Sequence, residues 1–202
     1  MLITATVGGM LWVVQATVVK QDKLFIQHSQ EMVASGLELR RRQLVGALRE
    51  YSMWDAMAEN VNPESLDREW LKVNMSDSVF VNQSANIQAI VDRQQKVNYL
   101  LLDGKLVPPD TKAESLAHII TTIYPLADHY SPYSKTPSPI GYVKVSEAGV
   151  DTYYLVVMEP IVQEYGFKVP RNGRFLLFAS ALDPVWVGAL GENFRLLEPS
   201  IR

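Results

Sequence analysis

The chain of 202 residues contains no cysteine. This absence excludes disulfide bonds, thiolate metal sites and a cysteine nucleophile together. It also fits a domain that lies outside the reducing cytosol and folds without covalent cross-links. Histidine is scarce: the chain has three, far apart in sequence, and none belongs to a zinc-binding motif. The sequence therefore indicates neither a metal site nor a cofactor.

Other patterns of catalytic residues are missing as well. The chain has no Gly-x-Ser-x-Gly motif, no Ser-x-x-Lys motif and no glycine loop that would hold a phosphate. The sequence thus favours a function other than catalysis, with a hydrolase whose acids meet only in the fold as an alternative. A formal net charge of −3 gives no basic surface for nucleic acid. The basic cluster at residues 40–42 is expected to form a solvated helix face rather than a phosphate clamp.

One long apolar run is present, from Met1 to Val19, and it holds no charged residue. Its length just reaches the roughly 17–20 residues that a membrane-spanning helix needs. No basic residue precedes the run and no Ala-x-Ala follows it, so we expect an uncleaved transmembrane anchor rather than a signal peptide. A buried core helix is the alternative. On the positive-inside rule the domain would face the cytoplasm, unless a longer native amino end carried further basic residues.

The polar stretch after the run predicts one long helix from Lys20 to about Asn60, since it contains no proline. Leu37, Leu44 and Tyr51 recur every seven residues and form an apolar stripe. Such a stripe is wide enough to pair with a partner helix, and we therefore expect a homodimer through this helix. Packing of the helix end on its own domain is the alternative.

The rest of the chain predicts an α+β domain with an antiparallel sheet of about five strands and helices on one side, an architecture that PAS-like sensory folds share with other α+β sheets of this size. Pro125 is expected to end the helix in which it lies, and Asp103-Gly104-Lys105 is expected to form a tight turn before a return strand at 106–107. A proline-rich loop is expected over 128–139, and a final short helix, capped by Asp183-Pro184, over 185–190. Helices are predicted over 63–74, 78–95 and 113–127, and strands over 97–102, 140–145, 152–158 and 174–181.

Candidate ligand-binding residues are aromatic or acidic. Trp54 and Asp55 place a large ring beside a carboxylate where the long helix should enter the domain, a pair suited to gripping a cation or amine or to hydrogen-bonding a backbone. The alternative is that Trp54 fills the core while Asp55 caps a helix or pairs with an arginine. The other candidates could equally be core packing residues, and they are Trp70, Tyr99, Tyr142 and Tyr154.

A block from Leu48 to Asn74 resembles the CHASE sensory domains of the fourth subclass. The block contains Tyr51-x-x-Trp54-Asp55, then Asn60, then Glu69-Trp70-Leu71 with a trailing Asn74. Two later segments are similar to the family at the level of pattern, and they are Tyr99 to Gly104 and Gly173 to Asp183.

The resemblance implies a sensory domain between two transmembrane helices, facing the periplasm or cell exterior from the inner membrane. It would bind an unknown small molecule and control a cytoplasmic output, either a cyclic-di-GMP enzyme or a histidine kinase, outside this chain. The domains would then be an anchor over 1–19, a signalling and dimerisation helix over 20–60, and a PAS-like sensory domain over 61–202. A membrane-anchored scaffold that binds a partner protein is the alternative function.

Overall fold

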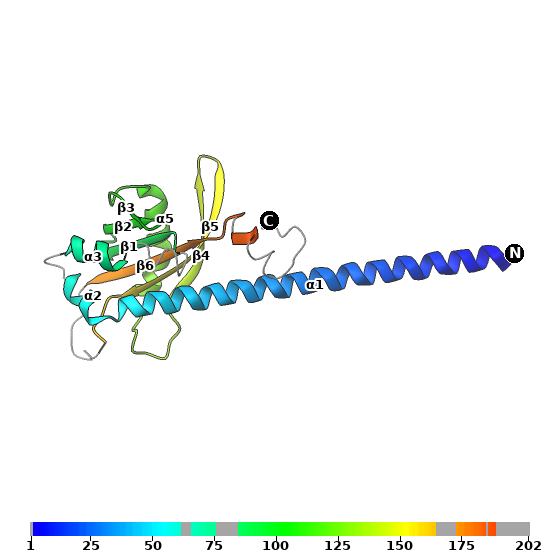
Figure 1. Cartoon of the computed structure of the whole chain (residues 1–202), viewed down its shortest axis with the longest axis horizontal. Helices are drawn as coiled ribbons and strands as arrows, with labels where there is room; N and C mark the ends of the chain where they lie inside the picture. Colours follow the sequence, from blue (N-terminus) through cyan, green and yellow to red (C-terminus); the bar gives the residue numbers. More distant parts are fainter. Residues whose placement is uncertain (1, 62–65, 76–84, 165–172, 185, 189–202) are drawn as a thin grey trace.

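A computed structural model describes residues 2–61, 66–75, 85–164, 173–184 and 186–188, and for residues 2–19 and Asp22 it describes the backbone alone. The fold is α+β, as predicted, with a long amino-terminal helix and one antiparallel sheet (Figure 1). The sheet has six strands in the order β3-β2-β1-β6-β5-β4, one more than the expected five or so. The strands are β1 (Ile87–Asp92), β2 (Val97–Leu102), β3 (Lys105–Leu106), β4 (Ile140–Glu147), β5 (Val150–Pro160) and β6 (Arg174–Ala181).

Helix α1 (Leu2–Ser52) dominates the shape of the molecule (Figure 1). Its 51 residues correspond to a length of about 76 Å at 1.5 Å per residue. The amino-terminal part projects away from the sheet, and the carboxyl-terminal part lies against it (Figure 1). Among the described residues, no helix is long and apolar enough to cross a membrane. The side chains of the predicted anchor, residues 1–19, lie outside that description.

The expectation of one helix to Asn60 is wrong, because α1 ends at Ser52 and a separate helix, α2 (Asp55–Asn60), follows. Trp54 interrupts the helix in an extended conformation, with φ −91° and ψ 124°. Its indole packs against the ring of Trp70, with centroids 5.0 Å apart, and this tertiary contact accompanies the break. Local helix propensity does not predict this break, because no proline or glycine lies between Ser52 and Asp55.

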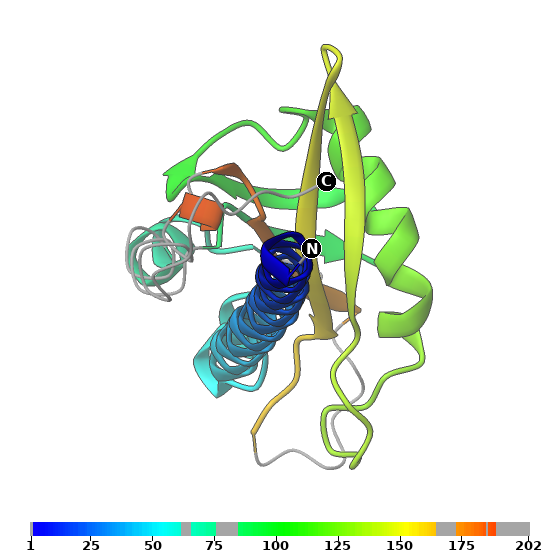
Figure 2. The ribbon, with the colours of Figure 1, turned by 90° about the vertical axis from the view of Figure 1, so that its right-hand side faces the viewer.

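Both faces of the sheet are covered, so the expectation of helices on one side is wrong. Figure 2, which looks along α1, shows α1 and α5 (Ala113–Asp128) on opposite sides of the sheet. Alternate residues of β5 explain this arrangement, since Leu155 and Val157 pack toward α1 while Val156 and Met158 pack toward α5. A strand that is apolar on both faces needs a cover on both faces.

Two other helix predictions need correction. The helix predicted over 78–95 contains β1 instead, because a short apolar run buried on both faces has no periodicity that separates strand from helix; its residues 78–84 lie outside the described chain. The helix predicted over 63–74 is observed as α3 (Arg68–Met75). The carboxylate of Asp67 accepts a hydrogen bond from the backbone amide of Trp70 at 2.9 Å. The predicted cap at 62–63 lies outside the described residues.

The carboxyl-terminal strands and the hairpin between β2 and β3 confirm the sequence analysis. Asp103 and Gly104 have φ values of 48° and 75°, which is the left-handed pair of a two-residue turn, and Lys105 already belongs to β3. Pro125 lies inside α5 and does not end it. Asp183 caps the segment after β6, as expected: its carboxylate accepts a hydrogen bond from the backbone amide of Trp186 at 2.8 Å.

Candidate functional site

Three of the predicted site residues meet where α1 ends. The ring of Trp54 lies 6.3 Å from that of Tyr51 and 5.0 Å from that of Trp70, and 37% of Trp54 is exposed. The carboxylate of Asp55 accepts the backbone amide of Glu164 at 2.7 Å, which ties α2 to the segment after β5. Of the roles considered for Asp55, the structure shows the hydrogen bond to a backbone.

The other predicted residues are dispersed. Tyr99 is fully buried in β2 on the α1 side of the sheet, and its hydroxyl has no hydrogen-bond partner within the described chain. Burial raises the pKa of Tyr99 and of Tyr154 above the ordinary value. Tyr154 packs on the opposite face with α5, and Tyr142 is 55% exposed on the edge strand β4. The six residues therefore do not line one cavity.

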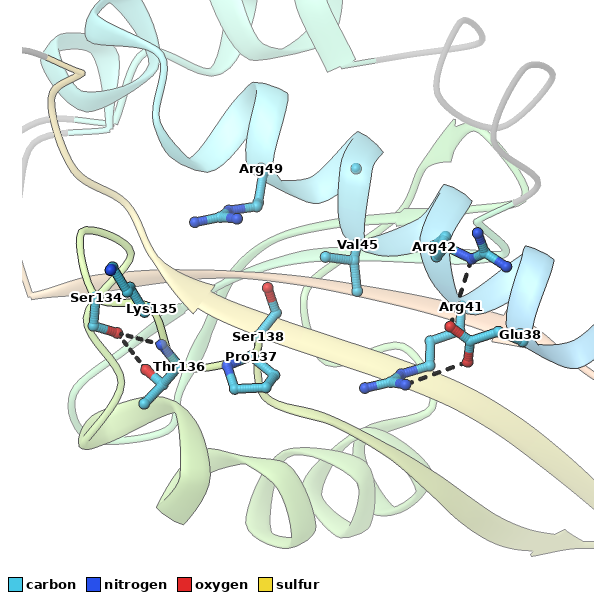
Figure 3. Close-up of a pocket in the computed structure, with 11 residues that line it drawn as sticks. Glu38, Arg41, Arg42, Val45, Arg49, Ser134, Lys135, Thr136, Pro137 and Ser138 are labelled. Atoms are coloured by element: carbon cyan, nitrogen blue, oxygen red, sulfur yellow. Dashed lines mark hydrogen bonds and ion pairs between the residues drawn. The ribbon is translucent and has the colours of Figure 1, made fainter.

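A groove runs between α1 and the loop that joins α5 to β4, residues 129–139 (Figure 3). We call this loop the α5–β4 loop. The groove has a volume of about 530 Å³, which is within the range of small-molecule sites. The loop contributes residues 134–138, and α1 contributes positions 38, 41, 42, 45, 46 and 49. Steps of three and four residues place those α1 positions on one face of the helix.

Positive charge dominates the groove. Four cations line it, Arg41, Arg42, Arg49 and Lys135, against one carboxylate, Glu38. Glu38 lies 3.3 Å from Arg41 and 3.5 Å from Arg42, so the two arginines share it.

Arg49 and the loop hold each other in place. Its Nη2 donates to the carbonyl oxygen of Pro132 at 2.9 Å, and its Nε is buried with no hydrogen-bond partner among the described residues. At the loop tip, the hydroxyl of Ser134 donates to the carbonyl of Ser131 at 2.7 Å and contacts the hydroxyl of Thr136 (Figure 3). The groove is therefore walled by a regular helix on one side and by a hydrogen-bonded loop on the other.

A buried acid, Glu159 of β5, lies beside this groove. It is fully buried, and Ser52 at the end of α1 donates to its Oε2 at 3.1 Å. Burial raises the pKa of Glu159, while hydrogen bonds from Ser138, Ser52 and Tyr130 and the charge of Arg49 act in the opposite direction. Ser138 and Arg49 also line the groove, so Glu159 interacts electrostatically with two of the groove residues.

The third arginine of the basic cluster, Arg40, points elsewhere. Its guanidinium donates from Nε and Nη2 to the hydroxyl of Ser180 in β6, at 3.0 and 2.8 Å. Ser180 is fully buried, so this contact fastens α1 to the centre of the sheet. Thus the cluster is not simply a solvated face: Arg40 is a structural contact, and its two neighbours line the groove.

The sequence analysis missed Arg49, Lys135 and Glu159 as site residues. Glu159 offered a signal, because it is a charged residue at the end of the apolar run from Leu155. Arg49 and Lys135 offered none, since their proximity depends on packing between α1 and a loop more than 80 residues later.

Comparison with known proteins identifies the family. The profile of the CHASE4 domain matches residues 36–199, which include α1 from the point where it meets the sheet. The chain belongs to the CHASE4 domain family. It is thus a sensory domain, as the resemblance of the Tyr51 to Asn74 block implies. No curated protein sequence matches it.

The CHASE4 domain described here is also similar in fold to solved structures of the periplasmic domain of LuxQ from Vibrio cholerae. A structure of the selenomethionine form has a TM-score of 0.51 and 14% sequence identity, and the match covers 83% of this chain and 68% of that chain. A second structure has a TM-score of 0.50 and 13% identity with the same coverage. At such identities the similarity concerns the fold alone.

Proposed function

We propose that this CHASE4 domain is the ligand-sensing part of a transmembrane receptor. In this proposal residues 1–19 hold the chain at the inner membrane with the domain outside, and α1 carries the effect of ligand occupancy to a cytoplasmic output. The output, a cyclic-di-GMP enzyme or a histidine kinase, lies outside the chain. The domain itself has no catalytic role, and its ligand is a small molecule.

The observation that carries the proposal is that one continuous helix both lines the groove and projects from the domain (Figure 1). Ligand contact with positions 38–49 would act directly on a rigid element that extends about 50 Å further toward its amino end. A ligand that binds more tightly to one position of α1 than to another shifts the equilibrium between them. No intermediate relay is needed between the groove and the membrane side.

The proposed dimer cannot use the stripe suggested by the seven-residue spacing. Leu44 is fully buried in the core of its own chain, and Leu37 and Tyr51 pack against the same core. The exposed apolar side chains Leu24, Phe25 and Ile26 lie instead in the projecting part, each at least 50% exposed. We therefore assign the dimer contact to this earlier segment of α1.

Insertions into α1 of the complete gene product test the coupling. Between Ser29 and Ser35, two added residues rotate the groove by about 200° relative to the amino end, whereas seven rotate it by only about 20° from two full turns. We expect the two-residue insertion to fix the output activity at one level regardless of ligand. The seven-residue insertion should leave the response of the output to ligand intact. Equal output from both insertions and from the unaltered protein would contradict transmission through α1.

Because the chain has no cysteine, single substitutions also report on the dimer. We expect Leu24→Cys to form a disulfide-linked dimer on mild oxidation, and the matched variant Gln43→Cys, on the part of α1 that packs on the sheet, to remain monomeric. Cross-linking at Gln43 but not at Leu24 would place the contact elsewhere.

A further inference from the structure

The groove between α1 and the α5–β4 loop has a charge opposite to that of the whole chain. Its lining carries a formal excess of three positive charges, in a chain whose formal net charge is −3. Like charges gathered around one groove repel one another unless an opposite charge neutralises them. Their concentration at the groove is therefore more simply explained by what the groove receives than by the needs of folding.

The cations in the groove are incompletely neutralised by the protein. Glu38 is shared between Arg41 and Arg42, and one carboxylate balances one charge. Arg49 donates to a neutral carbonyl, and Lys135 has no ion-pair partner in the part of the chain that the structure describes. Glu159 interacts with the charge of Arg49, but it lies outside the groove and is not among its lining residues.

Space for a ligand is available at the middle of the helix wall. A Cβ atom placed on Gly46 would meet no atom within 4 Å, so the wall is recessed there. The apolar side chains of the lining are Val45 and Pro137 only, and the loop adds hydroxyl groups at Ser134, Thr136 and Ser138 (Figure 3). Such a lining suits a compact polar ligand and gives little support to a lipid tail or a large aromatic group.

We propose that this groove binds a small organic polyanion, a molecule that carries at least two carboxylate or phosphate groups. Guanidinium groups bind both kinds of anion through paired N–H donors. Arg41 and Arg49 are separated by about 12 Å along the helix axis, which favours a ligand with two anionic groups over one with a single group. The inference rests on the proposed sensory function, because it names the chemical class of the ligand.

Isothermal titration calorimetry on the purified whole chain tests the inference. Sodium citrate probes the carboxylate source and sodium pyrophosphate the phosphate source, each at an ionic strength held constant with sodium chloride. We expect one of the two to bind saturably with one site per chain. Arg49→Gln and Arg41→Gln should each weaken that binding at least tenfold, which corresponds to about 1.4 kcal/mol.

Two matched variants distinguish binding of the anion in the groove from non-specific electrostatic attraction to the chain. Gly46→Leu changes no charge and replaces a poor helix former with a good one, yet it fills the recess, so it should also weaken binding at least tenfold. Lys105→Gln removes one positive charge from the exposed strand β3, at the opposite edge of the sheet from β4, and should leave binding unchanged.

Absence of saturable binding by both anions would overturn the proposal, as would equal effects of Lys105→Gln and Arg49→Gln. Binding that survives Gly46→Leu would place the anion outside the groove and would overturn it too. These results differ from a failure of the sensory function itself: if neither anion binds but a two-residue insertion in α1 still locks the output, the receptor proposal stands and only the ligand class is wrong.

Discussion

Replacing Glu159 by glutamine should stabilise the domain at neutral pH. The carboxyl group is fully buried, and within the described residues its Oε1 has no hydrogen-bond partner. Ser52 donates to its other oxygen at 3.1 Å, and glutamine retains an acceptor of the same shape for that bond. The substitution therefore removes a buried negative charge and leaves the packing intact.

The sign follows from the raised pKa of Glu159. Between the ordinary carboxyl pKa of the unfolded chain and the higher value of the folded chain, the folded state binds more protons, so stability falls as the pH rises. The fall is at most about 1.4 kcal/mol per pH unit and ends above the folded-state pKa. Below the unfolded-state pKa, both states are protonated and no penalty remains.

Urea unfolding of the wild-type chain and of Glu159→Gln, from pH 4 to pH 8, measures the effect. We expect the two free energies of unfolding to lie closest at pH 4 and to separate as the pH rises, with the glutamine variant the more stable. Glu59→Gln, at an exposed position of α2, is the control and should follow the wild type. A constant difference across this range, or a wild type that is the more stable at pH 7, would refute the reasoning.

Three further substitutions have defined outcomes. Gly46→Ala should raise the free energy of unfolding by about 0.5–1 kcal/mol, because the position is helical and unobstructed; a lower melting temperature would contradict the open space at this site. Ser180→Ala should cost about 1–3 kcal/mol in urea unfolding, since half-buried Arg40 loses its two hydrogen bonds to the Ser180 hydroxyl, and Ser35→Ala on exposed α1 should cost less. Trp54→Ala should lower stability by only about 1–2 kcal/mol, because the ring is partly exposed; a loss of 3–5 kcal/mol would assign Trp54 to the core instead.

Strands whose burial could be inferred from composition were predicted well. Residues 152–158 and 174–181 are nearly continuous apolar runs, and they form the adjacent strands β5 and β6. The same reasoning should have applied to residues 87–92, but this run is short and its flanking residues suggested helical spacing. The missing information was the partner strand, since β1 pairs with β6, almost 90 residues later.

The groove could not be predicted because its two walls are distant in sequence. The basic run at 40–42 was visible, but the directions of its side chains depend on what α1 packs against. Arg40 turns toward Ser180 and Arg41 toward the groove because α1 lies on the sheet with one fixed face inward. Periodicity identifies which residues share a helix face, and it does not identify which loop covers that face.

The attachment of α1 to the sheet has a mechanical consequence. Leu44 and Leu48 are fully buried against the strands, and Arg40 is bonded to Ser180, so this end of the helix moves with the sheet as one body. The remaining length, from Gly36 back to Leu2, is about 50 Å and behaves as a lever arm with its fulcrum at the domain. A rotation of this body by 5° displaces the far end of the helix sideways by about 4 Å. Under the proposed sensory function, a slight rotation of the domain around a bound molecule would thus become a displacement of several ångströms at the far end of α1.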